Sequence, residues 1–160
     1  MFANHGALKK HHHQIEGINS RLDGLQAAIL SAKLPYILEW TEKRIDNARL
    51  YDEYLKGIEQ IQIPAVRPDT KHTYHLYVIH AEKRNELAEF LKANNIETFI
   101  HYPTALPNLP AYKYLNYAPA DFPVSTGHQE RILSLPMFPE LQEHQIRWVA
   151  DCIRRFYGSK

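Results

Sequence analysis

The sequence is poor in cysteine: Cys152 is the one cysteine among its 160 residues, which excludes an intramolecular disulfide. A lone cysteine fits a reducing compartment, and Met1 to His13 lack the apolar core of a signal peptide. Since no apolar stretch is long enough to cross a bilayer, we expect a cytoplasmic protein. Cys152 falls in a helical pattern near the C-terminus, where we expect a packed thiol rather than a nucleophile.

An excess of charge of one sign is also lacking, because 19 lysines and arginines accompany 18 aspartates and glutamates. The formal net charge of +1 gives no basic footprint for nucleic acid or an anionic membrane, so we expect neither as a partner. Glycine is scarce, with 6 residues, and the chain has neither a G-x-S-x-G nucleophile elbow nor a glycine-rich phosphate loop. Serine-based hydrolysis therefore has no motif to support it.

The residues that are present are those of a globular domain. Hydrophobic residues make up 44% and charged residues 23% of the chain, which is normal for a protein with one core. Apolar residues recur at helical spacing from Leu22 to Tyr51. Pro35 lies inside this run and is expected to kink or break the helix, and Gly57 is expected to end it.

Strand and helix patterns follow one another in the rest of the chain. We expect strands at 58–66, 72–80, 96–103 and 133–136, and helices at 83–94, 125–132 and 141–157. The passage 103–123 is rich in proline and tyrosine and is expected to be structured but not helical. The predicted fold class is α+β, with a long N-terminal helix and a small antiparallel or mixed sheet that helices cover on one side.

Three consecutive histidines, His11, His12 and His13, invite a metal-site interpretation. Neighbouring side chains point to opposite faces of an extended segment and lie about 100° apart around a helix, so the three cannot form a tetrahedral site together. No paired cysteine or acidic ligand stands at zinc-site spacing elsewhere. We therefore expect a structural or solvated role for these histidines and no metal.

Asn19 and Arg21 stand directly before the apolar run LQAAILSAKL, at the entrance of the expected helix. A helix N-terminus has free backbone N–H groups and a partial positive charge, so it favours anions such as phosphate. In the alternative interpretation, Asn19 or Ser20 only caps the helix and Arg21 is a surface charge. The residues alone do not decide between the two.

His101 and Tyr102 stand where an expected strand runs into a proline-rich loop. Loops at strand ends commonly carry binding residues. In the alternative interpretation, Tyr102 packs against the fold and His101 is a polar group satisfied by its neighbours. The residues alone favour this alternative.

Short motifs occur in a fixed order along almost the whole chain. They are Asn4-His5-Gly6, Gly17, Asn19, Arg21-Leu22-Asp23, Gln26 to Leu30, Lys33-Leu34, Arg44, Tyr51, Tyr74 to Tyr77, His101-Tyr102-Pro103, Asp121-Phe122-Pro123, Leu133 to Pro136 and Phe138-Pro139. Together they resemble the C-terminal portion of the DegT/DnrJ/StrS family of sugar-nucleotide aminotransferases. The combination is far more specific than any one of its pieces.

The resemblance implies the fold of type I pyridoxal phosphate (PLP) enzymes, with 22–160 as the C-terminal small domain and 1–21 as a remnant of the large domain or linker. In the family, the large domain precedes the Asn-His-Gly motif. It carries the lysine that forms the Schiff base and the acid that pairs with the pyridine nitrogen. Lys9, Lys10 and Lys33 do not match that lysine, so we assign no catalytic residue. The complete enzyme, implied to be a homodimer, would transfer an amino group, from glutamate, to a keto-sugar nucleotide.

Carried over residue by residue, the resemblance gives Asn19 the role of the asparagine that reaches the PLP phosphate of the neighbouring subunit. Arg21 becomes a contact for phosphate or substrate, and His101 and Tyr102 line the sugar-nucleotide site. Many members have a P-L-H-like run after the Tyr-Pro, whereas this chain has Ala105-Leu106-Pro107, so the sugar is not identified. We expect the chain alone to be inactive, to bind PLP weakly and to associate. The alternative is a non-catalytic module that binds a sugar nucleotide or a partner subunit.

Overall fold

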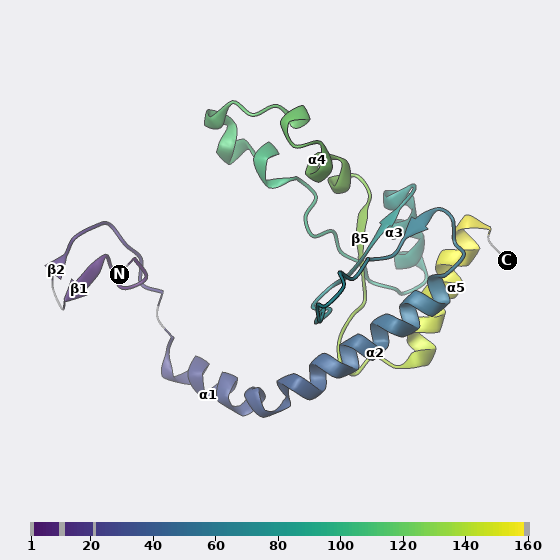
Figure 1. Cartoon of the computed structure of the whole chain (residues 1–160), viewed down its shortest axis with the longest axis horizontal. Coiled ribbons are helices and arrows are strands. Elements are labelled where there is room, and N and C mark those ends of the chain that lie inside the picture. Colours follow the sequence, from purple (N-terminus) through teal and green to yellow (C-terminus); the bar gives the residue numbers. More distant parts are fainter. Residues whose placement is uncertain (1, 10–11, 21, 159–160) are drawn as a thin grey trace. The chain divides into compact units, whose positions relative to one another are not determined.

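The computed structural model describes residues 2–9, 12–20 and 22–158 (Figure 1). Contacts between residues divide the chain into two compact units, the first ending at Leu38 and the second beginning at Glu39. The sequence led us to a boundary between residues 21 and 22, which separates a large-domain remnant from the small domain. A compact unit need not coincide with a domain of a family, so that boundary stays a prediction.

Two short antiparallel strands, β1 (Ala7–Lys9) and β2 (His12–His13), lie in the first unit. Backbone hydrogen bonds extend the pairing beyond the strands, since His5 N donates to the Ile18 carbonyl oxygen at 2.9 Å. Asn4 and Asn19 form an antiparallel bridge further along. The backbone around Asn19 is thus held by a second stretch of chain.

Gly17 is required where these two stretches meet. A Cβ atom at Gly17 would lie 2.2 Å from the nitrogen of Gly6 and 2.5 Å from the carbonyl oxygen of Phe2. Real side chains do not tolerate such distances, so only glycine lets the two backbones approach this closely.

The long N-terminal helical run is interrupted, as Pro35 predicted. Helix α1 covers Gly24–Lys33, a 3₁₀ turn covers Leu34–Tyr36, and α2 covers Ile37–Leu55. Pro35 lies inside the 3₁₀ turn, where its missing N–H is tolerated. Gly57 follows α2 with a φ of +83°, the left-handed conformation in which glycine commonly ends a helix.

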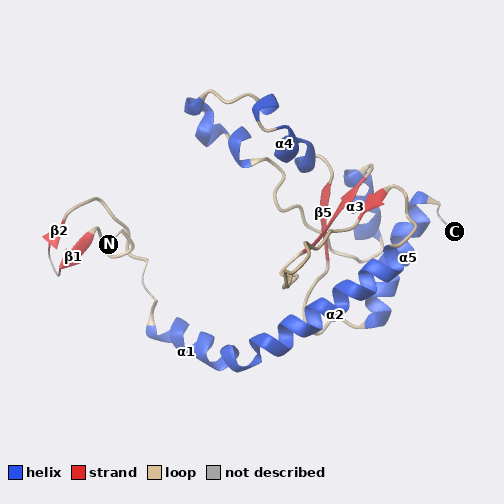
Figure 2. Ribbon diagram, in the orientation of Figure 1, coloured by secondary structure: helices blue, strands red, loops and turns tan. Residues whose placement is uncertain are grey.

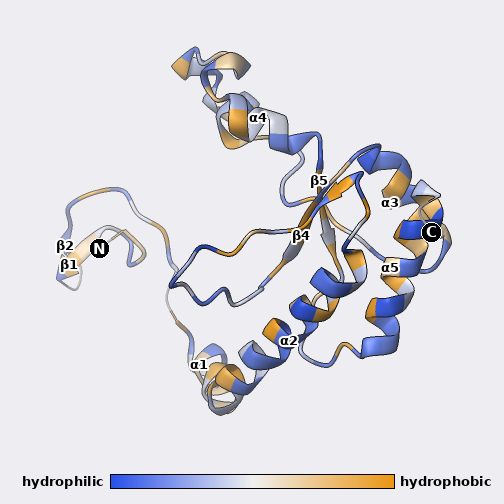
Figure 3. Cartoon of the chain, turned by 45° about the vertical axis from the view of Figure 1, so that its right-hand side comes forward, coloured by the Kyte–Doolittle hydropathy of each residue, from blue (hydrophilic) through white to orange (hydrophobic). Residues whose placement is uncertain are grey.

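Helix α1 buries none of its side chains. Leu25 is 75% exposed, and Ile29 and Leu30 are also exposed. Figure 3 shows apolar residues, in orange, along this helix. Contiguous exposed apolar surface of this kind commonly marks a surface that another molecule or domain covers.

A three-stranded antiparallel sheet, in the order β3-β4-β5, lies in the second unit. Its strands are β3 (Ile61–Gln62), β4 (Tyr77–Ala81) and β5 (Ile132–Leu135). Tyr77 pairs with Leu135, and Val78 pairs with Ser134. The sheet is therefore antiparallel, one of the two types that the sequence left open.

Alternation along β4 and β5 gives the sheet two unequal faces. One face contributes to the hydrophobic core through Tyr77, Ile79, Ala81, Leu133 and Leu135. The other face carries Val78, His80, Ile132 and Ser134. The polar side chains His80 and Ser134 thus share the face that lies away from the core.

Helices α2, α3 (Arg84–Ala93) and α5 (Glu143–Tyr157) pack on the core face of the sheet (Figure 2). Their core residues are Ala48, Tyr51, Leu55, Leu87, Leu91, Ile146, Val149, Ala150, Cys152 and Ile153. These apolar positions recur three or four residues apart, as expected for helices with one buried face. Cys152 is fully buried in α5, which confirms the packed thiol expected from the helical pattern.

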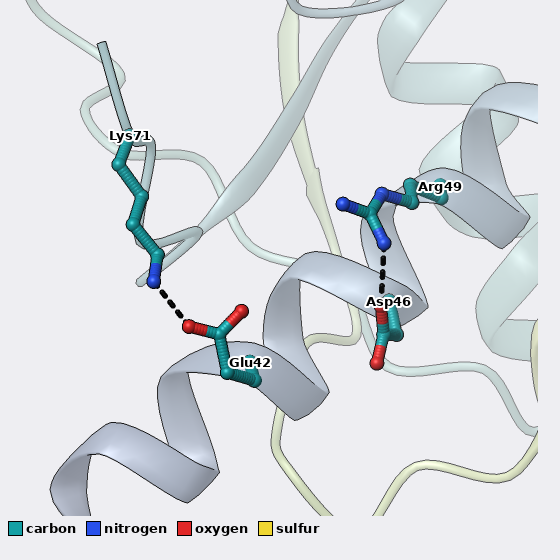
Figure 4. Close-up of polar contacts among 4 residues, drawn as sticks. All are labelled: Glu42, Asp46, Arg49 and Lys71. Atoms are coloured by element: carbon teal, nitrogen blue, oxygen red, sulfur yellow. Dashed lines mark hydrogen bonds and ion pairs between the residues drawn. The ribbon is translucent and has the colours of Figure 1, made fainter.

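The opposite side of α2 is charged. Arg49 Nη1 lies 2.8 Å from Asp46 Oδ1, and Lys71 from the loop before β4 forms an ion pair with Glu42 (Figure 4). Exposed ion pairs contribute little to stability. The buried side of α2 is therefore what holds it in place.

Three of the expected strands are shorter than predicted. Only β3 forms within 58–66, residues 72–76 precede β4, and 96–103 contributes only the isolated bridge of Phe99 with Ser134. Local hydrogen bonding explains one of these differences. The His72 ring accepts the Tyr74 backbone N–H at 2.9 Å, and Tyr74 has a φ of 46°, which is incompatible with a strand.

The proline-rich passage contains three 3₁₀ helices, at Leu106–Asn108, Pro110–Leu115 and Pro119–Asp121. Each has a proline in its first turn, where the missing N–H costs no hydrogen bond. Helix α4 follows at Pro123–Gln129, somewhat earlier than the expected 125–132. The prediction of a wholly non-helical passage was therefore wrong, because proline is compatible with the start of a short helix.

Candidate functional site

A groove of about 550 Å³ lies in the second unit between the end of β5, the segment 95–101 and α5. Its lining combines the aromatic rings of Phe99, Phe138 and Trp148 with polar groups of His101 and His144. Sites for small molecules have this size and this mixture of apolar walls with a few polar groups. We refer to this feature as the β5 groove.

Helix α2 holds one wall of the β5 groove through hydrogen bonds to main-chain carbonyl oxygens. Arg44 Nη1 donates to Met137 at 2.8 Å, Asn47 Nδ2 donates to Phe138 at 3.0 Å, and Tyr51 Oη donates to Pro136 at 3.0 Å. The three donors are three and four residues apart, so they lie on one face of the helix. The segment after β5 is therefore fixed by a helix that is distant in sequence.

Arg44 also donates from Nη1 to the carbonyl oxygens of Tyr74 and His75, at 3.3 and 3.4 Å. One guanidinium group thus joins the segment before β4 to the segment after β5. Arg44 was part of the family motif, but its sequence context gave no sign of this structural role.

His101 lies at the β5 groove and contacts β5 directly. Its Nδ1 is 2.9 Å from Ser134 Oγ, and Ser134 is 3% exposed. Phe99 and Ser134 exchange both backbone hydrogen bonds, at 2.7 and 3.2 Å, which fixes the segment that carries His101. In its polar contact, His101 agrees with the interpretation of a group satisfied by its neighbours, and it also lines a groove.

Tyr102 is 74% exposed, so the interpretation in which it packs against the fold was wrong. Its ring is perpendicular to that of His101, with centroids 5.7 Å apart. The role of His101 and Tyr102 in a common site stays a prediction.

Residues 103–131 are tied to the sheet at their C-terminal end. Arg84, at the start of α3, donates to the carbonyl oxygens of Ile132 at 3.0 Å and Gln129 at 3.2 Å. The rings of His80 and His128 contact each other, with centroids 4.4 Å apart. Burial, followed by the positive charges of His128 and Arg131, lowers the pKa of His80.

Asn19 is exposed in the first unit. It precedes Asp23, which is the N-cap of α1, so the interpretation of Asn19 or Ser20 as the helix cap was wrong. The backbone N–H of Asp23 receives further support from Gln26 Oε1, which accepts it at 3.0 Å. Arg21 lies outside the described residues. His101 and Tyr102 lie in the second unit.

Ser134 is one of the residues at the β5 groove that the sequence analysis did not propose as site residues. A signal for it was present, because the alternation of Leu133, Ser134 and Leu135 places the serine on the face opposite the two leucines. The contact with His101 could not be found in this way, since the two residues come from separate parts of the chain.

The described residues fit only part of a PLP site. Every described lysine is exposed, whereas the lysine that binds PLP is commonly activated in a desolvated pocket. Asn19 is exposed, and its side chain is an amide, a group that can donate a hydrogen bond to a phosphate oxygen. The described residues include no cluster of three metal-ligating side chains, and none of the described helices is long and apolar enough to span a membrane.

Comparison with known proteins gives a match over 1–154 to the model of the DegT/DnrJ/EryC1/StrS aminotransferase family. The chain is 40% identical, over 96% of its length, to the pleiotropic regulatory protein of Geobacillus stearothermophilus. It is 38% identical, over 95% of its length, to the UDP-N-acetyl-3-dehydro-alpha-D-glucosamine 3-aminotransferase of Acidithiobacillus ferrooxidans.

Among solved structures, DesV of S. venezuelae matches 100% of the chain with a TM-score of 0.89 and 34% identity. The α+β architecture is therefore similar to that of the matching segment of DesV. The chain spans 42%, 40% and 43% of the lengths of these three proteins.

Proposed function

The chain belongs to the DegT/DnrJ/EryC1/StrS aminotransferase family, and we propose that it is the C-terminal portion of a PLP-dependent enzyme that aminates a keto-sugar nucleotide. The observation that carries this proposal is the family match over 1–154. The named activity of the Acidithiobacillus relative, an aminotransferase for a 3-dehydro sugar nucleotide, supports the substrate class. Glutamate as the amino donor and the cytoplasm as the location belong to the same proposal.

In this proposal, Asn19 donates a hydrogen bond to the cofactor phosphate, and Arg21 contacts phosphate or substrate. His101 and Tyr102 contact the sugar nucleotide from the β5 groove and its rim. Bound PLP carries the amino group between the donor and the keto sugar. The chain's own residues bind and orient these two ligands.

The chain by itself is proposed to be inactive and to bind PLP weakly. Support comes from the exposure of all its described lysines and from the modest strength of one amide hydrogen bond, about 0.5–1.5 kcal/mol. The exposed apolar side chains of α1 support a further proposal, that this helix is covered by a large domain or a second subunit in a homodimer.

A chimera tests the proposal. In it, this chain replaces the matching part of the Acidithiobacillus aminotransferase, and transfer of the amino group of glutamate to UDP-N-acetyl-3-dehydro-alpha-D-glucosamine is followed. We expect amino transfer by the chimera and none by the 160 residues alone. A folded chimera that retains PLP but neither transfers the amino group nor binds the sugar nucleotide would contradict the proposal.

Asn19→Ala in the same chimera tests the cofactor contact. We expect weaker PLP retention, by roughly two- to tenfold, which corresponds to one hydrogen bond of this strength. The matched control is Gln14→Ala, which removes another exposed amide from the first unit. Equal PLP retention in the parent and both variants would remove Asn19 from the site.

A second candidate is a non-catalytic module that binds a sugar nucleotide or a partner subunit. The name of the Geobacillus relative, a pleiotropic regulatory protein, favours it. This candidate predicts sugar-nucleotide binding by the chain together with a chimera that lacks amino transfer.

A further inference from the structure

The contact between Ser134 and His101 indicates which ring nitrogen of His101 carries the proton. The serine is 3% exposed, so its hydroxyl cannot exchange partners freely with bulk water. Within the described part of the chain, the hydroxyl makes one hydrogen bond, to His101 Nδ1 at 2.9 Å. The backbone pairing of Phe99 with Ser134 keeps the two side chains in register.

Two arrangements of the hydrogen are possible in this contact. If Nδ1 carries the imidazole proton, it donates to Oγ, and the buried hydroxyl hydrogen has no acceptor among the described residues. If the hydroxyl donates to Nδ1, both groups are satisfied and the imidazole proton resides on Nε2. A buried donor without an acceptor is costly, so the second arrangement is favoured.

We infer that Ser134 is a positioning residue that holds His101 as the Nε2–H tautomer, with Nε2 as a hydrogen-bond donor for an oxygen of the bound ligand. The two ring nitrogens point to different sides of the ring, so Nε2 is directed away from Ser134. A donor at this position suits a hydroxyl or phosphate oxygen and does not accept a proton in the neutral form. The identity of the ligand as a sugar nucleotide rests on the proposed function, whereas the tautomer does not.

Nitrogen-15 NMR of the imidazoles tests the tautomer at a pH where the histidines are neutral. In the parent chain we expect His101 to be protonated on Nε2, and its Nδ1 resonance to be displaced by the serine hydroxyl from that of the exposed His75. Ser134→Ala should return the Nδ1 resonance to the position seen for His75. Ser134→Thr keeps a hydroxyl and should restore the displacement.

A parent chain with the proton on Nδ1 overturns the inference, as does an Nδ1 resonance that is the same in the parent and in Ser134→Ala. The tautomer of His101 in the parent chain tests the inference even if the alanine variant fails to fold. A purely structural serine would leave the imidazole resonances unchanged.

Titration of the parent with UDP-N-acetylglucosamine tests the ligand. We expect the His101 Nε2–H resonance to move on binding, and Ser134→Ala to weaken binding by about three- to tenfold, with Ser134→Thr within about twofold of the parent. Binding that leaves His101 unaffected overturns the donor role. Absence of binding, together with the expected tautomer, contradicts the sugar-nucleotide assignment of the proposed function and leaves the role of Ser134 standing.

Discussion

Tyr51→Phe is the substitution that best tests how the wall of the β5 groove is held. It removes the hydroxyl that donates to the Pro136 carbonyl oxygen at 3.0 Å and leaves the ring in place. The ring is fully buried and stacks on Tyr77 with centroids 4.8 Å apart, so packing should survive. The change therefore isolates one buried hydrogen bond between α2 and the segment after β5.

The expected loss in the free energy of unfolding is about 1–2 kcal/mol. A net hydrogen bond contributes about 0.5–1.5 kcal/mol, and a buried group left without a partner costs about 1–3 kcal/mol. Pro136 is only partly buried, so water offsets some of the second cost. For a chain of this size, the melting temperature should fall by roughly 2–8 °C.

Urea unfolding followed by the fluorescence of Trp40 and Trp148 measures this loss. The matched control is Tyr54→Phe, on the same helix, which removes an exposed hydroxyl that bonds to Glu143. The control should unfold at nearly the parent's urea concentration. If Tyr51→Phe were as stable as the parent, or no less stable than Tyr54→Phe, the idea that α2 anchors this wall would be refuted.

Two further predictions concern the first unit and the pH dependence of stability. Gly17→Ala places a Cβ atom 2.2 Å from the Gly6 nitrogen and should disrupt the pairing of residues 2–7 with 13–20. Hydrogen exchange at the His5 and Ile18 amides measures this effect. The control is Gly127→Ala, which has open space around its Cβ and should leave those amides protected. Equal protection of the amides in both variants would contradict the close approach of the two backbones at Gly17. Burial and the charges of His128 and Arg131 lower the pKa of His80 in the folded state. The unfolded state therefore binds the His80 proton more tightly than the folded state does. The stability that depends on neutral His80 is lost as pH falls below about 6.5. The urea midpoint of His80→Gln should therefore depend less on pH between about 7 and 5 than that of the parent, and parallel curves would show that His80 is not responsible.

The elements that could be predicted from the sequence are those whose pattern is local. Apolar spacing located α3 and α5 closely, and Pro35 marked the break between α1 and α2 because proline acts on its own turn. The region around Tyr74 was misjudged because a single hydrogen bond from its amide to His72 overrides a β-branched, aromatic composition.

The candidate site was predictable only in part, for a similar reason. The sequence singled out His101 and Tyr102 at the end of an expected strand; the structure places His101 at the β5 groove and leaves Tyr102 exposed, and their binding roles stay predictions. Ser134 and Arg44 act through partners far away in sequence, at Nδ1 of His101 and at the Met137 carbonyl oxygen. No local pattern encodes such pairings. The cofactor and substrate roles of Asn19 and Arg21 stay predictions.

The hydrogen bonds from α2 to the segment after β5 have a consequence for how the β5 groove can change during evolution. In residues 136–138, the groups that accept hydrogen bonds from Arg44, Asn47 and Tyr51 are main-chain oxygens, which every amino acid supplies. The side chains of Met137 and Phe138, which line the groove, are therefore not needed for these hydrogen bonds. Under the proposed function, substitutions at these two positions can change the ligand preference while the path of the backbone stays the same.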